Sequence, residues 1–205
     1  MIHISVTNEH LLKAENLFDF KKLNNSITDG DGNLAGALGE VIVCEYYNCK
    51  QENTYNYDLT INSIKIDVKT KRFTSTFTPN KNWNLNISDF NTNQKCDYYC
   101  FVGISDDYKE AYIYGFICKD DFFKLARFGR KNDIDPFGNG KWKYRANCYN
   151  ILISELNQFE EIINDTNISN FAYVDSDCFN QLEVNDDLIK MNQQNISEYI
   201  QLSLF

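Results

Sequence analysis

The sequence predicts a single domain of the α/β (α+β) class, and three stretches carry that prediction. Residues 57–71 alternate apolar and polar side chains on both sides of residues 62–63, which is typical of a β-hairpin. Residues 34–50 place apolar side chains three or four positions apart, which indicates an amphipathic helix. Residues 98–104 are nearly all apolar, as expected of a strand buried on both faces at the centre of a sheet.

Composition sets the broad limits. A chain of 205 residues, 43% hydrophobic and 15% aromatic, has enough apolar surface for one packed domain. No apolar run approaches the ~18 residues of a membrane-spanning helix, and no basic-then-apolar leader opens the chain, so we expect a cytoplasmic protein. The seven cysteines form no Cys-x-x-Cys pair and are joined only by His3 and His10, which favours free thiols over zinc or disulfides.

The net charge of −9 is unevenly distributed along the chain. Residues 1–156 hold 19 Lys and Arg against 20 Asp and Glu, whereas residues 157–205 hold only Lys190 against nine acids. The acidity therefore belongs to the tail. The remainder is close to neutral, so its basic residues could still gather on one face and bind DNA.

The hairpin predicts a pair of facing carboxylates. With a loop at residues 62–63, Ile61 pairs with Ile64, and three rungs further out Asp58 lies opposite Asp67. Like charges about 5 Å apart repel by roughly 3 kcal/mol at an effective dielectric constant of 20. A divalent cation with hard oxygen ligands, Mg or Mn, would relieve the repulsion. The alternative is a solvated polar face with a loose turn.

The two faces of the hairpin differ in chemistry. We expect burial of the apolar face, which is made of Tyr57, Leu59, Ile61, Ile64, Ile66 and Val68. The polar face is made of Asp58, Thr60, Lys65, Asp67, Lys69 and Lys71. Lys69 therefore points to the same side as the two acids.

The helix over residues 34–50 carries an unusual second face. Gly36, Ala37 and Gly39 surround a single acid, Glu40, although each glycine costs a helix ~1 kcal/mol relative to alanine. Small residues allow a neighbouring element to approach closely, so Glu40 could reach a site on an adjoining sheet. The alternative is an ordinary exposed glutamate.

Four further segments complete the expected elements. They are one or two amphipathic helical turns over 9–23, a third strand or its approach over 83–87, a strand over 110–117 that pairs with 98–104, and a short helix over 119–126. From about residue 158 the chain becomes acidic and asparagine-rich, and we expect a partly ordered appendage.

A basic stretch precedes that appendage. Its seven basic residues are Lys124, Arg127, Arg130, Lys131, Lys141, Lys143 and Arg145, against only Asp133 and Asp135. Its aromatic residues are Phe128, Phe137, Trp142 and Tyr144. Such a mixture suits phosphate contacts with stacking partners, and the alternative is a solvated loop.

Taken together, Glu40 on the helix, Asp58, and then Asp67-Val68-Lys69 on the next strand resemble the PD-(D/E)XK nuclease superfamily. The resemblance covers about residues 34–126 and departs at Tyr57, where the name-giving proline would stand. It implies a restriction-endonuclease-like core, in which helices flank a mixed central β-sheet.

The resemblance also implies Mg- or Mn-dependent hydrolysis of DNA phosphodiester bonds. Asp58, Asp67 and the carbonyl group of Val68 would hold the ion, and Glu40 would complete its shell through water or hold a second ion. Lys69 would position or deprotonate the attacking water and stabilise the developing charge. Lys71, Arg72 and the basic stretch would contact DNA. The alternative is a catalytically silent DNA-binding or regulatory protein with the same fold, associated with a DNA sliding clamp.

The last five residues, Gln201-Leu202-Ser203-Leu204-Phe205, resemble the peptide by which bacterial replication and repair proteins dock on the DNA sliding clamp. The resemblance implies that Gln201 hydrogen-bonds at a small pocket while Leu202, Leu204 and Phe205 fill an apolar groove. We therefore expect a nuclease domain over 1–157, an acidic spacer over 158–200 and a clamp-binding peptide over 201–205, at work on DNA in replication, repair or recombination. The alternative is a hydrophobic terminus that folds back on the core.

Overall fold

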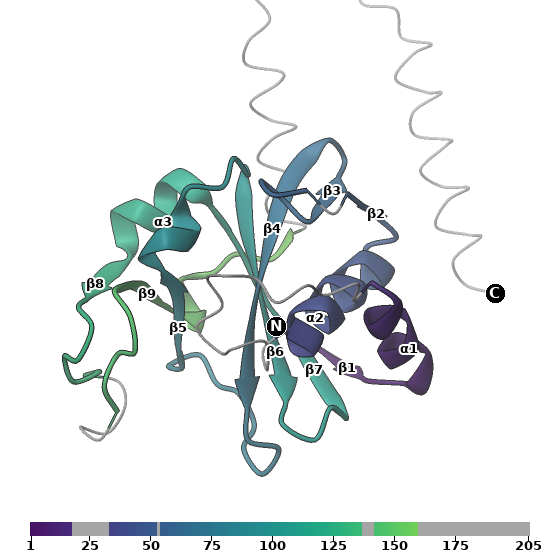
Figure 1. The fold of residues 1–205 in the computed structure, drawn as a ribbon, viewed down its shortest axis with the longest axis horizontal. Coiled ribbons are helices and arrows are strands. Elements are labelled where there is room, and N and C mark those ends of the chain that lie inside the picture. The colour runs from purple at the N-terminus through teal and green to yellow at the C-terminus, as the bar shows by residue number, and fades with distance from the viewer. Residues whose placement is uncertain (18–32, 53, 137–141, 160–205) are drawn as a thin grey trace, which may run out of the picture. The chain divides into compact units, whose positions relative to one another are not determined.

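The computed structural model of the chain describes residues 1–17, 33–52, 54–136 and 142–159 (Figure 1). Lys141, most of the predicted spacer and the predicted clamp-binding peptide over 201–205 lie outside these residues. The described part contains helices and two sheets, which confirms the α+β class. Among the described helices, none is long and apolar enough to cross a membrane.

A six-stranded sheet forms the centre. In spatial order its strands are β1 (Ile2–Ser5), β7 (Glu110–Cys118), β6 (Tyr98–Ser105), β4 (Ile64–Phe73), β3 (Leu59–Ile61) and β2 (Lys50–Gln51). Its pairs are antiparallel except β4 with β6, which run parallel, so the sheet is mixed.

The hairpin of β3 and β4 has the register that the sequence predicts, with Ile61 opposite Ile64 and Leu59 opposite Ile66. Asn62 and Ser63 both have positive φ angles, 48° and 68°. Two successive residues in this region are typical of the turn that suits the twist of paired strands. The turn therefore fixes the register. The last pair of the ladder is Leu59 with Ile66, and the next residues outward on the two strands are Asp58 and Asp67.

The predictions for 98–104 and 110–117 are confirmed. Strand β6 lies between β4 and β7 and is buried along nearly its whole length, as an apolar run at a sheet's centre must be. Strand β7 returns antiparallel to it, and Ile104 pairs with Ala111 next to the turn.

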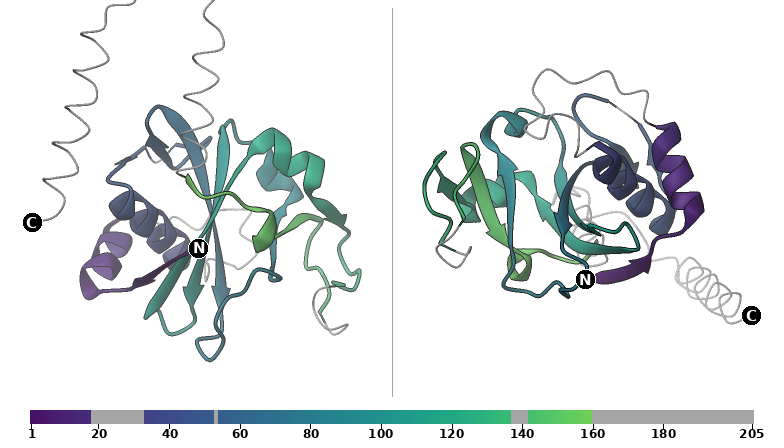
Figure 2. Two further views of the ribbon diagram at one scale, coloured as in Figure 1. Left: turned by 180° about the vertical axis from the view of Figure 1, so that it is seen from behind. Right: turned by 60° about the horizontal axis from the view of Figure 1, so that its bottom comes forward.

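Helices cover one face of this sheet, and the second sheet with a third helix covers the other (Figures 1 and 2). Thr7 caps helix α1 (Asn8–Asn16), because its hydroxyl accepts from the His10 amide at 3.2 Å. Helix α2 (Asn33–Tyr46) ends four residues before the predicted limit, because Asn48 has a positive φ of 47° and β2 begins at Lys50. Helix α3 (Lys119–Leu125) matches the predicted short helix.

A three-stranded antiparallel sheet, absent from the sequence prediction, lies on the side of α3. It consists of β5 (Asn84–Ser88), β9 (Cys148–Leu152) and β8 (Arg127–Gly129). The predicted third strand over 83–87 exists as β5, but it pairs with β9 instead of joining the main sheet. Short 3₁₀ helices, η1 (Asp89–Thr92) and η2 (Ile153–Glu155), follow β5 and β9. Leu85, Ile151, Phe101 and Phe122 belong to the core between the two sheets.

Candidate functional site

Glu40 is positioned by close packing of α2 on β4. A Cβ atom at Gly39 would overlap Oγ1 of Thr70 and would lie 3.3 Å from its Cβ, so only glycine allows this approach. The next residue, Glu40, is partly buried and accepts a hydrogen bond at 3.0 Å from Nε2 of Gln51 on β2. The small face of the helix therefore has the role that the sequence suggested: it brings an acid to the sheet.

Asp58 is held by main-chain groups on both sides of Asp67. Its amide donates to the carbonyl of Ile66 at 2.9 Å, and its Oδ2 accepts from the amide of Val68 at 2.7 Å. The carboxylate therefore takes a place that a backbone carbonyl would take in a continued ladder. This arrangement brings Asp58 next to Asp67 at the end of the hairpin.

Asp67 and Lys69 lie together on β4. Lys69 Nζ is 2.6 Å from Asp67 Oδ2, and the two side chains keep 15% and 4% of their exposed surface. The sequence places both on the polar face of the hairpin, and solvation of that face is the alternative to a metal site. Asp67 is buried instead, because β5 and the segment that follows it pack over this face of the sheet.

The side chain of Gln94 contacts both Asp67 and Lys69. Its side-chain oxygen is 3.4 Å from Lys69 Nζ, and with the two ends of the amide exchanged its nitrogen donates to Asp67 Oδ2 at 3.2 Å and to the carbonyl of Asn91. We favour the exchanged orientation, because it satisfies both polar atoms of the amide. The main-chain carbonyl of Gln94 accepts a hydrogen bond from the amine of Lys119, which holds the chain at residue 94 in place.

The four residues predicted as the site interact electrostatically. Burial, and then the charges of Glu40 and Asp67, raise the pKa of Asp58 to about 8, against the smaller effects of the Val68 amide and Lys69. Burial also raises the pKa of Glu40, opposed by the hydrogen bond from Gln51. Three acids thus share one lysine, so the cluster is short of positive charge when all are ionised.

The donor chemistry of this cluster fits a hard divalent cation. Its ligands would be oxygens of Asp58 and Asp67, and Mg²⁺ needs only one or two protein carboxylates because it keeps several waters. The buried hydroxyl of Tyr99, which pairs in register with Asp67, has no hydrogen-bond partner in the described part of the chain. Within the same ranges, no three His, Cys, Asp or Glu side chains converge closely enough to hold a metal as they stand.

The predicted DNA contacts on β4 are engaged within the protein. Lys71 donates to the carbonyl of Asn84 at 2.6 Å and so ties the main sheet to β5. Arg72 donates to the carbonyl of Asp106 at 3.2 Å, and its guanidinium lies 5.3 Å from the ring centre of Tyr108. Both residues are exposed, and the amine of Lys71 serves as a structural link between the two sheets.

The predicted basic stretch divides into two groups. Lys124 pairs with Asp121 at 2.7 Å, and Arg127 binds both carboxylate oxygens of Glu155 at 2.9 Å. The second group is exposed and has no ion pair to the described residues; it consists of Arg130, Lys131, Lys143 and Arg145. The second group is the one available to a phosphate.

Two residues at the site were missed by sequence analysis, Gln51 and Gln94. Each is a glutamine in a short strand or connecting segment, without a periodic pattern around it. Their contacts span 11 and 25 residues of chain, so no local signal could have identified them.

No family model matches the chain, and no curated protein matches it closely enough to count as a relative.

Proposed function

We propose that the protein is a divalent-metal-dependent deoxyribonuclease that hydrolyses DNA phosphodiester bonds. The observation that carries the proposal is the cluster around Lys69 of Glu40 on α2, Asp58 just before β3, and Asp67 on β4. Strongly perturbed pKa values of buried acids cluster at functional sites, where a catalytic group needs them.

The roles follow from the contacts. Bound Mg²⁺ or Mn²⁺ would polarise the phosphoryl oxygen and acidify a water molecule. Asp58 and Asp67 would hold the ion. The Val68 amide keeps the Asp58 carboxylate oriented toward β4. The side-chain amide of Gln51 fixes the orientation of the Glu40 carboxylate. The amine of Lys69 would position the attacking water and stabilise negative charge on the phosphate.

The exposed basic group would hold the substrate. Arg130, Lys131 and Arg145 carry charges that the described protein leaves uncompensated, as expected of phosphate contacts. The near-neutral charge of residues 1–156 means that such contacts act locally rather than through a strongly basic surface.

A catalytically silent DNA-binding or regulatory protein is the second candidate. The observation in its favour is the direct pairing of Asp67 with Lys69 beneath Gln94, since such a pair can also serve as a structural element. Against it stands the full set of three acids and one lysine.

Cleavage assays separate the two candidates. Purified full-length protein with Mn²⁺ should cleave at least one of linear, nicked, branched and single-stranded DNA. Asp67→Ala and Lys69→Ala should each lower the rate about 10²- to 10⁴-fold. Lys65→Ala, an exposed lysine on the same strand, should not change it. Absence of cleavage on all substrates, or cleavage unaffected by the first two variants, would refute the enzyme.

We also propose that the acidic segment after residue 157 tethers the nuclease to a DNA sliding clamp through Gln201–Phe205. Support comes from the resemblance of Gln201-Leu202-Ser203-Leu204-Phe205 to a clamp-docking peptide and from the net charge of −8 over 157–205, which disfavours binding to DNA. A tether raises the effective concentration at the target to the millimolar range, so a weak intrinsic affinity for DNA suffices.

A further inference from the structure

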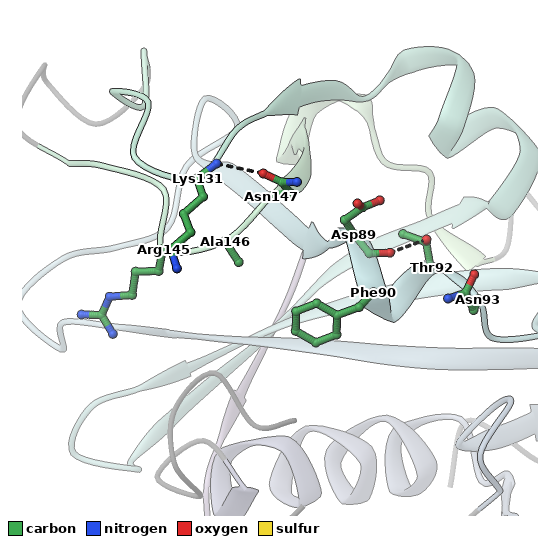
Figure 3. A pocket seen from close by; sticks show the side chains of 8 residues that line it. All are labelled: Asp89, Phe90, Thr92, Asn93, Lys131, Arg145, Ala146 and Asn147. Carbon is green, nitrogen blue, oxygen red and sulfur yellow. Dashed lines mark hydrogen bonds between the residues drawn. The ribbon is translucent and has the colours of Figure 1, made fainter. Parts of the chain in front are cut away.

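A groove of about 450 Å³ runs beside η1. We call it the η1 groove; it is lined by Asp89, Phe90, Thr92, Asn93, Lys131, Arg145, Ala146 and Asn147 (Figure 3). Its volume is within the 300 to 1,000 Å³ that is usual for small-ligand sites. The groove is therefore large enough for a nucleotide unit.

One wall of the η1 groove is cationic. The side chain of Lys131 extends toward the base of the Arg145 side chain, whose guanidinium group lies on the far side of Lys131 from Phe90 (Figure 3). Both are exposed, and neither forms an ion pair with a described residue. Lys124 and Arg127 of the same stretch, by contrast, are paired within the protein.

The opposite wall presents an aromatic face. Phe90 is 44% exposed, and its ring points toward the two cations (Figure 3). Thr92 and Asn93 add polar groups to this wall. Asp89 also lines the groove, but its carboxylate points away from the Phe90 ring (Figure 3), and its main-chain amide is bound to the carbonyl of Asn147 at 2.9 Å.

The η1 groove adjoins the candidate active site through the chain itself. Asn93 lines the groove, and the next residue, Gln94, contacts Lys69 and Asp67. The groove and the candidate site are therefore joined through two consecutive residues of one segment.

We propose that the η1 groove binds an unpaired DNA strand next to the bond that is cut, with a base stacked on Phe90 and its phosphates on Lys131 and Arg145. This inference rests on the proposed nuclease function and specifies its substrate: DNA with a single-stranded segment. Stacking on a side chain needs a free base face. In a duplex both faces of each internal base are covered by neighbouring base pairs, so Phe90 can discriminate against paired DNA.

The test measures binding without cleavage. Full-length protein in EDTA is titrated against fluorescein-labelled oligo(dT) of 20 nucleotides and against a duplex of the same length, with fluorescence anisotropy as the readout. The single strand should bind at least about fivefold more tightly. Phe90→Ala should weaken single-strand binding about 5- to 100-fold, since stacking contributes that much per base, while Phe90→Trp should retain it.

Salt dependence tests the cationic wall separately. Lys131→Ala/Arg145→Ala removes two phosphate contacts, so the slope of log K against log salt for the single strand should fall by about 1.4. Phe77→Ala removes a phenylalanine that is 63% exposed elsewhere, and Lys50→Ala/Lys109→Ala removes two exposed lysines. Neither control should change the affinity or the slope.

Several results would overturn the inference. Equal affinity for duplex and single strand, an affinity indifferent to Phe90→Ala, or an unchanged slope in Lys131→Ala/Arg145→Ala would each do so. Tighter binding of oligo(U) than of oligo(dT) would reassign the groove to RNA and likewise reject it. All variants alter exposed side chains, so they should fold. The readout requires no catalysis, so an inactive protein would refute the nuclease proposal and leave this result standing.

Discussion

Gly39 on α2 lies so close to Thr70 on β4 that a methyl group at residue 39 would overlap the threonine hydroxyl. This contact sets the distance between helix and sheet, and Glu40 reaches the cluster of acids because of it. The hydroxyl of Thr70 is itself buried without a hydrogen-bond partner in the described part of the chain. Packing of Gly39 on Thr70 therefore sets the position of the helix, and the hydrogen bond from Gln51 orients the Glu40 side chain.

Gly39→Ala should destabilise the protein by about 1–3 kcal/mol, because the helix must move away from the sheet. Gly36→Ala is the matched control: a Cβ there has no neighbour within 4 Å, so the better helix propensity of alanine should stabilise by up to about 1 kcal/mol. Thermal and urea unfolding would measure both. Thr70→Ala should restore part of the loss in the double variant, and equal effects of the two glycine substitutions would contradict the packing argument.

The raised pKa of Asp58 predicts how stability changes with pH. The folded protein holds the Asp58 proton up to about pH 8, whereas the unfolded chain releases it near the ordinary value of 3.8. Unfolding between these values releases a proton, so the free energy of unfolding should fall as the pH rises across this window. Melting temperatures in EDTA at pH 5, 6.5 and 8 would show the decline.

Two additions sharpen that measurement. Mn²⁺ should raise the melting temperature most at pH 8, where the carboxyl ionises most readily, because a ligand that binds only the folded state stabilises it. Asp58→Asn should flatten the pH dependence and remove the Mn²⁺ effect, whereas Asp120→Asn, an exposed acid on α3, should alter neither. A wild-type profile that does not change with pH would argue against the coupling of the acids.

Gln94 is expected to position the Asp67–Lys69 pair. Gln94→Ala should lower kcat about tenfold with little change in melting temperature, because Lys119 holds the main-chain carbonyl of residue 94 whichever side chain is present. Steady-state kinetics on the substrate that is cleaved best would separate kcat from KM. A rise in KM alone would show that Gln94 contacts DNA and does not orient the lysine.

Removal of Gln201–Phe205 should abolish binding to a bacterial sliding clamp and leave cleavage of free DNA nearly unchanged. Surface plasmon resonance on immobilised clamp would measure the first effect, and the cleavage assay the second. A matched variant that keeps the length, Leu202→Ala/Leu204→Ala/Phe205→Ala, should behave in the same way. If the shortened protein melts at a markedly lower temperature or retains its affinity for the clamp, the peptide belongs to the folded domain.

Local signals account for what the sequence could predict. The hairpin over 57–71 follows from strict alternation and two turn residues, and β6 from an uninterrupted apolar run. Glu40, Asp58, Asp67 and Lys69 emerged because their spacing matches a known arrangement. Burial of Asp67 was missed, because alternation assigns a residue to a face of the sheet but does not tell what covers that face.

Long-range pairing accounts for most of what was missed. Strand β8 is only three residues long and lies within a basic stretch, so no period could be recognised in it. Strand β5 alternates as predicted, but its partner β9 lies about 60 residues further along the chain, and propensity does not specify a partner. Gln94 was missed for the same reason, because its position depends on the long-range pairing that holds the β5–η1 segment in place.

The path of the chain between β4 and β6 has a consequence for dissecting the protein. These parallel neighbours are joined through β5, which pairs with β9 near residue 150. A fragment that stops at residue 126 would contain every residue of the acid cluster but would leave β5 as an unpaired strand and one side of the core open to water. Such a fragment should aggregate, and during synthesis the cluster can reach its final packing only after residue 152 has left the ribosome.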